Sequence, residues 1–389
     1  DKENALAPFY SINKDGIKIF ASASDKIADR YEFTVAWKDM ETFGKDLKLY
    51  KTAQLMDKYS GHYDQSVAVC LLAVNEELPS KNPAGLFYGY RIAIDAGHTA
   101  GTIAEGEVEQ KFLKFKPNPN IGLNDSIQLA EGMLTYATAA LLKEKLEQEG
   151  ASVFLTRPFN GSTAYGVTFD DWLKSNYKSK IQGLYPNAAE RRNWFLTKAT
   201  KKDKFKLIFK DMELQKRAEL INDYRPDFTV IIHYNVDETN TGWTKPGPKN
   251  FSMAFIGGAF MRSDLSSREK RFEFLRMIAS MDIELSLALS ESVVKSLESN
   301  LNVKAATTGD ATYLSKGCLY AGRKGVFCRN LQLTRYIHGP LVYGETLYQD
   351  NFSECILLNK ELDKLKNMRV QQAADAYFKG VKEYVENWK

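Results

Sequence analysis

Short apolar runs rich in β-branched residues alternate along this chain with longer stretches of helical periodicity. Runs of this kind are typical of strands in the centre of a parallel sheet, where both faces are covered. The alternation predicts an α/β fold with a mixed, largely parallel sheet and helices on both faces. The apolar runs lie at 91–97, 151–157, 228–233, 251–256 and 340–345, and the helical patterns at about 125–148, 212–222, 266–300 and 370–387.

The first part of the chain, residues 1–88, has a different pattern and predicts a small N-terminal α+β subdomain. Proline, glycine and serine between 77 and 85 indicate a linker after it. We therefore expect two units, 1–88 and 89–389. In the first unit, strand-like runs lie at 10–12, 16–20, 31–37 and 67–74, and a helical stretch lies at about 47–58.

Two of the four histidines in the chain stand at the ends of apolar runs. His98 directly follows the run 91–97, and His233 ends the run 228–233. In open α/β sheets, ligands bind just outside the carboxyl ends of the strands. Two imidazoles brought to that edge by neighbouring strands therefore predict a metal site.

Composition changes this picture little. The chain has 389 residues, 44% of them hydrophobic, and a net charge of +4, which is typical of a soluble globular protein. No run approaches the roughly 18 apolar residues that a membrane-spanning helix needs, so we expect no transmembrane segment. The chain begins at Asp1 rather than at methionine, and we expect a targeting segment to be absent from it.

Cysteine is sparse, and none of the four cysteines forms a CxxC pair, so a zinc site built from thiolates is not expected. Cys318 and Cys328 are the pair closest in sequence and would form the disulfide of an exported protein. Buried free thiols are the simpler expectation.

Several motifs, taken in order, resemble those of the zinc-dependent N-acetylmuramoyl-L-alanine amidases, the Amidase_3 family. That family typically shows a strand ending in D-P-G-H, a glutamate opening the first helix, a G-x-x-V-x-L-T-R strand, S-I-H-x-N and P-x-V-L-V-E. The corresponding segments here are 92–98, a helix ending at Gly150, 153–157, 231–235 and 340–345. The resemblance covers about 89–385 and implies the α/β fold of that family.

The resemblance also implies zinc as the cofactor and a ligand set of His, Glu and His. His98 and His233 match the two histidine positions. The family spacing of the glutamate before the glycine that precedes the G-x-x-V strand gives Glu131. Glu107 and Glu109 lie closer to the loop position that shorter members use, and they stay as alternatives. Three nitrogen or oxygen ligands leave a catalytic zinc ion a fourth position for water.

Glu345 ends a buried strand, which is a costly place for an unpaired carboxylate. By resemblance it matches the family's second glutamate, which is not a ligand and moves a proton from the attacking water to the leaving amine. Asn235 belongs to the I-H-x-N motif, and Arg335 resembles an arginine that precedes the last strand. Both are expected to contact the substrate, and for Arg335 an ordinary ion pair is the alternative.

Three stretches exceed the compact core of the family and are expected to be insertions: 99–130, 158–210 and 262–284. Within the first of them, we expect residues 99–125 to be irregular. Some relatives block the metal with an added helix until an activator binds. The helical stretch 265–281 is a candidate for such a device, and an ordinary surface helix is the alternative.

The second insertion is strongly basic. Between Asp171 and Arg217 there are thirteen Lys or Arg against five Asp or Glu, interleaved with aromatic residues. No nucleic-acid motif accompanies this pattern, so we expect no nucleic-acid partner. We interpret the stretch as a solvated lysine face over an aromatic core.

The function implied by the resemblance is hydrolysis of the amide bond between N-acetylmuramic acid and L-alanine in peptidoglycan. Such an enzyme acts in the periplasm or outside the cell, and an activator protein is a further partner to expect. Two alternatives keep the same fold: a non-catalytic or autoinhibited wall-binding regulator, and a zinc peptidase that acts on the stem peptide.

Overall fold

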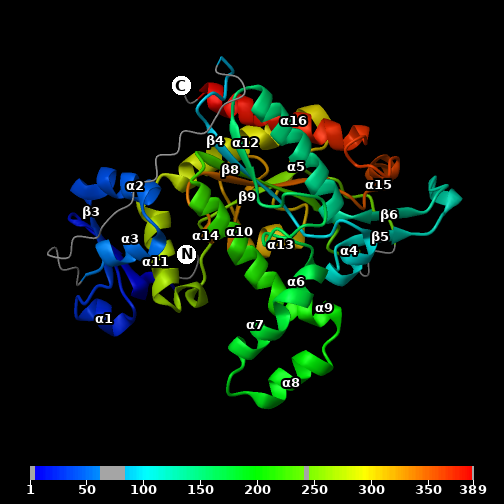
Figure 1. The fold of residues 1–389 in the computed structure, drawn as a ribbon. Coiled ribbons are helices and arrows are strands. Elements are labelled where there is room, and N and C mark those ends of the chain that lie inside the picture. The colour runs from blue at the N-terminus through cyan, green and yellow to red at the C-terminus, as the bar shows by residue number, and fades with distance from the viewer. Residues whose placement is uncertain (1–4, 62–83, 241–244, 388–389) are drawn as a thin grey trace.

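The computed structural model describes residues 5–61, 84–240 and 245–387. Its centre is a seven-stranded sheet, and the α/β fold expected from the sequence is confirmed (Figure 1). Four neighbouring strands, β12, β8, β4 and β7, run parallel, whereas β9 is antiparallel to β12. In spatial order the strands are β10 (Cys318–Tyr320), β11 (Val326–Arg329), β9 (Met253–Ile256), β12 (Leu341–Tyr348), β8 (Phe228–Asn235), β4 (Arg91–Ala96) and β7 (Ser152–Leu155).

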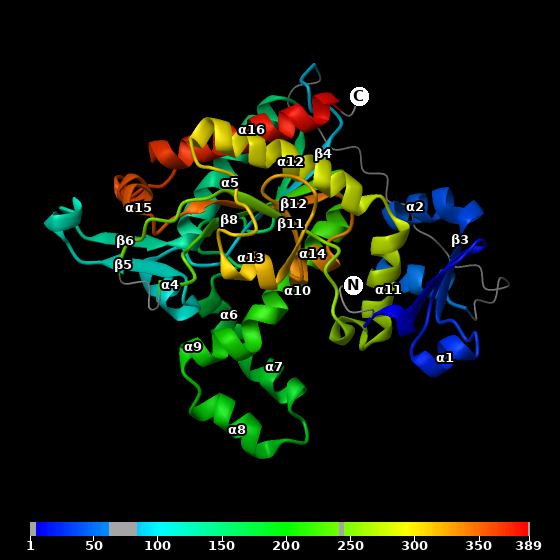
Figure 2. The ribbon, with the colours of Figure 1, turned by 180° about the vertical axis from the view of Figure 1, so that it is seen from behind.

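Helices cover both faces of this sheet (Figure 2). On one face, α5 (Glu131–Gln148), α12 (Asp282–Leu301) and α16 (Met368–Asn387) share a core with alternate residues of the parallel strands. On the other face, α10 (Lys210–Tyr224) and α14 (Gln332–Tyr336) pack on the remaining residues. Because successive side chains of a strand point to opposite faces, His233 shares the α10 face with Ile231 and Tyr343.

Two expected helices have different limits. The helix predicted from about 125 begins at Glu131, because Ile127–Ala130 forms strand β6, which pairs with β5 (Phe112–Phe115) in a hairpin. The stretch 99–125, expected to be irregular, thus contains β5 and the helix α4 (Ile103–Glu109).

The pattern 266–300 forms two helices, α11 (Arg268–Ala279) and α12. The chain turns between the two helices. Buried Arg276 of α11 stabilises this turn, because it binds Asp282, the first residue of α12, and also donates to the carbonyl of Arg335. The short hairpin of β10 and β11 was not predicted, because runs of three or four residues carry little periodicity.

The N-terminal residues form a small unit with the three strands expected near 10, 16 and 31, namely β1 (Tyr10–Ile12), β2 (Gly16–Ile19) and β3 (Phe33–Ala36). Helices α2 (Met40–Leu49) and α3 (Thr52–Lys58) follow. The strand expected at 67–74 and nearly all of the expected linker lie outside the described residues.

This unit completes its core with α11, the helix of the expected insertion 262–284 (Figure 1). The rings of Phe33 and Phe272 pack edge to face at 5.3 Å, and Arg271 pairs with Glu32 at 2.6 Å. Helix α11 therefore holds the N-terminal unit through its apolar face. This is a packing role, and the blocking role considered for 265–281 stays a prediction.

The insertion 158–210 is helical and extends away from the sheet (Figures 1 and 2). It has an aromatic core of its own, in which the Trp172 and Phe209 rings lie 4.7 Å apart. This arrangement agrees with the interpretation of lysines over an aromatic core. Its elements are α6 (Phe169–Ser175), α7 (Tyr177–Leu184), α8 (Ala189–Thr197), α9 (Lys201–Lys204) and a π-helical turn (Phe205–Phe209).

The remaining short elements are α1 (Ala23–Ile27), α13 (Thr312–Lys316), α15 (Phe352–Asn359) and the 3-10 turns Ala7–Phe9, Trp37–Asp39, Pro119–Ile121 and Arg262–Leu265. Cys318 is buried and Cys328 is partly buried, and no disulfide joins the two. Within the described residues, every helix is too short or too polar to cross a membrane.

Candidate metal centre

The segment after β4 brings His98 close to His233. His98 has a φ of +57°, a left-handed conformation, and its ring centroid lies 5.0 Å from that of His233. Gly97 makes this approach possible, since a Cβ atom there would lie 2.1 Å from Cε1 of His233. Its amide also donates to the carbonyl of Ile232 at 2.9 Å, which ties the segment to β8.

Two buried arginines hold the same segment through its carbonyl groups. Arg217 donates to the carbonyls of Ala96 at 2.9 Å and His98 at 3.0 Å, and it pairs with buried Asp95 at 3.3 Å. Arg157 donates to the carbonyl of Thr99 at 3.0 Å. These contacts fix the backbone that carries His98. In the sequence, Asp95 inside an apolar run was the feature that could have pointed to a buried arginine partner.

Glu131 joins the two histidines. Its carboxylate oxygens lie 3.2 Å from Nε2 of His98 and 3.0 Å from Nδ1 of His233. One potential ligand atom from each of the three residues lies within 4.8 Å of the others. Glu131 is the first residue of α5 and only 2% exposed, and the amide of Tyr234 donates to it at 3.2 Å. The structure thus brings together the three residues that the sequence proposed as ligands.

The two alternative glutamates have different positions. Glu109 faces the other nitrogen of His98, with Nδ1 to Oε1 at 3.0 Å, and it accepts the amides of Thr99 at 3.0 Å and Ala100 at 3.1 Å. A carboxylate on one ring nitrogen orients the other nitrogen toward a metal, so this is the position of a supporting partner. Glu107 is exposed and pairs with Lys114.

The surroundings favour ionised carboxylates and a neutral His233, whereas for His98 the charges of Glu131 and Glu109 outweigh burial and raise the pKa. Burial opposes ionisation of Glu109, but the charge of His98 and its hydrogen bond lower the Glu109 pKa to about 2. Burial opposes ionisation of Glu131 as well, yet His98 and Lys111 hold its pKa well below the usual range. Burial lowers the pKa of His233, which favours the neutral ring that a metal requires.

Glu345 lies on β12, beside the cluster. It is paired in register with His233 on β8 and with Met253 on β9, and it is 8% exposed. Burial and then the negative charge of Glu131 raise its pKa to about 8, although the charges of Arg329 and Lys111 act against this rise. Within the described part of the chain, its carboxylate has no hydrogen-bond or ion-pair partner. This group is therefore free to exchange a proton with a bound molecule.

The two residues expected to contact substrate are placed differently. Asn235 ends β8 beside the cluster, and its Nδ2 donates to the hydroxyl of Tyr313 at 2.8 Å. Arg335 lies 3.6 Å from Asp264 and also binds Asn330. The structure does not join Arg335 to the histidines. Tyr313, from the short helix α13, was not predicted, because no motif marks it.

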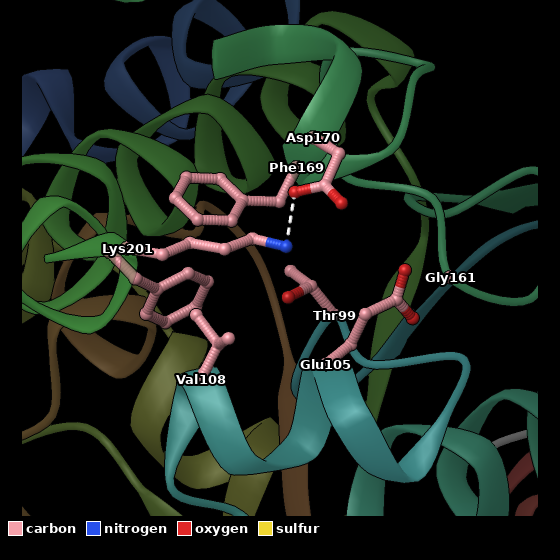
Figure 3. Close-up of a pocket in the computed structure, with 8 residues that line it drawn as sticks. Thr99, Glu105, Val108, Gly161, Phe169, Asp170 and Lys201 are labelled. Carbon is pink, nitrogen blue, oxygen red and sulfur yellow. Dashed lines mark ion pairs between the residues drawn. The ribbon is translucent and has the colours of Figure 1, made fainter.

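Next to the His98 segment lies a small cavity lined by α4 and the helical insertion (Figure 3). Thr99 and Glu105 face the ion pair of Asp170 and Lys201 across it (Figure 3). Its volume is about 10 Å³, which is room for roughly one water molecule. The cavity thus marks where the insertion packs behind the site rather than a place for substrate.

Comparison with known proteins identifies the family. The family model N-acetylmuramoyl-L-alanine amidase (Amidase_3) matches residues 92–383. The solved CwlD amidase of Clostridioides difficile, in complex with the GerS lipoprotein, is 16% identical, with a TM-score of 0.40 over 77% of this chain and 100% of that chain. The amidase Ami1 of Mycobacterium abscessus is 16% identical, with a TM-score of 0.41 over 77% of this chain and 99% of that chain. No curated protein matches. Since the family model spans well over half of the sequence, the chain belongs to the N-acetylmuramoyl-L-alanine amidase family.

Proposed function

We propose that this protein is a zinc-dependent amidase that hydrolyses the bond between N-acetylmuramic acid and L-alanine in peptidoglycan. One observation carries the proposal: His98 and His233, from the ends of adjacent strands β4 and β8, meet Glu131 at the start of α5, with the carboxylate of Glu345 on the next strand, β12. Membership of the amidase family supports the reaction and the substrate class.

The donor set fits zinc. Two imidazole nitrogens and one carboxylate oxygen form a ligand set found in catalytic zinc sites. Both imidazoles face this carboxylate, since Oε2 of Glu131 lies 3.2 Å from Nε2 of His98 and Oε1 lies 3.0 Å from Nδ1 of His233. One donor atom from each residue lies within 4.8 Å of the others, so the three residues could hold one ion. When bound there, zinc supplies a Lewis acid that polarises the scissile carbonyl and lowers the pKa of a water molecule.

Glu345 moves the proton in the proposed reaction. Its carboxylate accepts a proton from the attacking water and delivers it to the nitrogen of the leaving L-alanine. The raised pKa of about 8 suits the delivery step. A cation held by the three ligands offsets the repulsion from Glu131, which favours the ionised form that first acts as a base.

Other residues of the chain orient these groups. Glu109 accepts the Nδ1–H of His98 and leaves Nε2 for the metal. The ring of Tyr343 stacks on His233 at 4.5 Å with an interplanar angle of 5°, which restricts the second imidazole. Asn235, at the end of the same strand as His233, is placed to contact the substrate.

The test compares the full chain with Glu345→Gln on purified sacculi. We expect both proteins to bind zinc and the wild-type protein to release peptides with a free L-alanine amine, detected by mass spectrometry. The variant should be at least about 100-fold slower, as is usual when a general base is removed. The matched control is Glu291→Gln, which removes an exposed carboxylate paired with Arg323 on the surface.

The other outcomes decide between the alternatives. Cleavage within the stem peptide would identify a zinc peptidase. Bound zinc without any product would indicate a wall-binding or autoinhibited protein. We further propose that the protein acts outside the cytoplasm, in the periplasm or beyond the cell, that an activator protein assists it, and that the catalytic domain begins near residue 89.

A further inference from the structure

Arg329, the last residue of β11, lies with its guanidinium group against two aromatic rings. Its Cζ atom is 4.8 Å from the centroid of the Phe255 ring and 4.8 Å from that of the Tyr313 ring. Aromatic faces hold a planar guanidinium in place while leaving the donors at its edge available. Among the residues that the structure describes, no carboxylate pairs with Arg329 and no hydrogen bond involves its side chain.

The buried arginines of this domain have acceptors, whereas Arg329 is partly buried. Arg217 pairs with Asp95, Arg276 with Glu273, and Arg369, which is also partly buried, with Glu354. Arg335, the arginine that the sequence favoured for substrate contact, is likewise next to Asp264. Arg329 therefore differs from them, because rings position it and no acceptor within the described residues binds its donors, so they can take an acceptor from outside the protein.

The aromatic contacts of Arg329 lead directly to the proposed catalytic site. The Phe255 ring lies 6.0 Å from the Tyr343 ring, and Tyr343 in turn stacks on His233. On the other side, the hydroxyl of Tyr313 accepts the hydrogen bond from Asn235. The guanidinium thus lies on the face of the sheet that carries His233, on the side of β9 and β11.

We propose that Arg329 binds a carboxylate of the stem peptide while the scissile amide lies at the cluster of His98, Glu131 and His233. The inference rests on the proposed function and narrows its substrate to muropeptides with a free carboxylate near L-alanine. A carboxylate accepts two parallel hydrogen bonds from a guanidinium group, whereas an amidated carboxyl group loses the charge and one acceptor. Arg329 is thus a specificity residue and does not itself carry the proton.

The experiment measures binding rather than turnover. Two probes are titrated into the zinc-loaded Glu345→Gln protein by calorimetry: N-acetylmuramoyl-L-alanyl-D-glutamate, and the same compound with both carboxyl groups amidated. We expect the free acid to bind about 10- to 100-fold more tightly, which is the usual effect of a charge-assisted hydrogen-bond pair. Adding Arg329→Met should reduce this preference to near unity by weakening the acid alone.

Two further variants make the result specific. Arg329→Lys keeps the charge but not the planar fork, and it should retain only part of the preference; it also serves if the methionine variant fails to fold. Arg323→Met, an exposed arginine in the turn before β11, should keep the full preference. Equal affinity of the parent for both probes, or an unchanged preference in Arg329→Met, would overturn the inference.

The outcome is independent of the hydrolysis test. A preference for the acid that depends on Arg329, together with absent cleavage of sacculi, would reject the proposed reaction but leave the binding role of Arg329 intact. Cleavage by the wild-type protein without such a preference would do the opposite.

Discussion

Replacing Glu109 with glutamine should weaken metal binding about 10- to 100-fold without removing a ligand. The Glu109 carboxylate lies 3.0 Å from Nδ1 of His98 and accepts backbone amides from Thr99 and Ala100. Glutamine has nearly the same shape but loses the charge that holds His98 in the Nδ1–H tautomer. Partners of this kind change metal affinity by about 10- to 100-fold, which corresponds to about 1.4–2.7 kcal/mol.

The assay is competition for zinc between the full-length protein and a chromophoric chelator near neutral pH. Glu107→Gln is the matched control, since Glu107 lies two residues earlier on the same helix but is exposed and paired with Lys114. Glu131→Gln provides the second reference, because it alters a proposed ligand. Thermal unfolding of the metal-free proteins checks that each variant is folded.

The three variants separate the possible roles of the glutamates. Wild-type affinity in Glu109→Gln would refute the supporting role. A loss as large as that of Glu131→Gln would make Glu109 a ligand, which is the alternative that the sequence left open. An equal loss in Glu107→Gln would show that the effect comes from net charge alone.

Three more predictions concern the surroundings of the metal. Gly97→Ala places a methyl group 2.1 Å from the His233 ring. We expect this variant to lose zinc binding and about 1–3 kcal/mol of unfolding free energy, measured in urea. Gly44→Ala, where no atom lies within 4 Å of the added carbon, should retain both zinc binding and stability. Arg217→Met leaves the buried carboxylate of Asp95 without its arginine and should lower the free energy of unfolding by about 3–5 kcal/mol. Arg323→Met, at an exposed arginine, should lower it by less than about 1 kcal/mol. Equal urea midpoints for the two variants would contradict this prediction. Chelation should lower the unfolding temperature, since a ligand at 100 times its Kd adds about 2.7 kcal/mol; an unchanged temperature in zinc-free and zinc-loaded samples would argue against a bound ion.

The neighbourhood of His98, His233 and Glu345 could be predicted from the sequence for a simple reason. Parallel strands end at the same edge of a sheet, so residues at the ends of apolar runs come together once the order of the strands allows it. The register agrees, because Ala96 pairs with Ile232 and Glu345 with His233. Glu131 could be chosen only from the spacing of the family motif. The helical pattern begins upstream of it, at about 125, and so does not mark Glu131 as the first residue of the helix.

The failures have a common physical origin. Residues 127–130 form a strand because β5 supplies a hydrogen-bonding partner, and local periodicity cannot report a partner. The substrate contact expected of Arg335 likewise depended on a partner that the sequence could not report, and the structure shows the ordinary ion pair that was its alternative. Asp264 is distant in sequence from Arg335 but lies next to it in the fold, whereas no carboxylate pairs with Arg329 within the described residues.

The sequence by itself determined five of the seven strands of the sheet, its principal helices and the polar groups delivered to one edge, because strand and helix periodicity are local properties of the chain. Only the tertiary structure decided that Glu109 faces the outer nitrogen of His98, that α11 packs against the N-terminal unit, and that no carboxylate of the described residues pairs with Arg329. These outcomes depend on contacts between segments far apart in sequence. The packing of the whole chain decides which of these segments come into contact, and no single segment shows this in its own sequence.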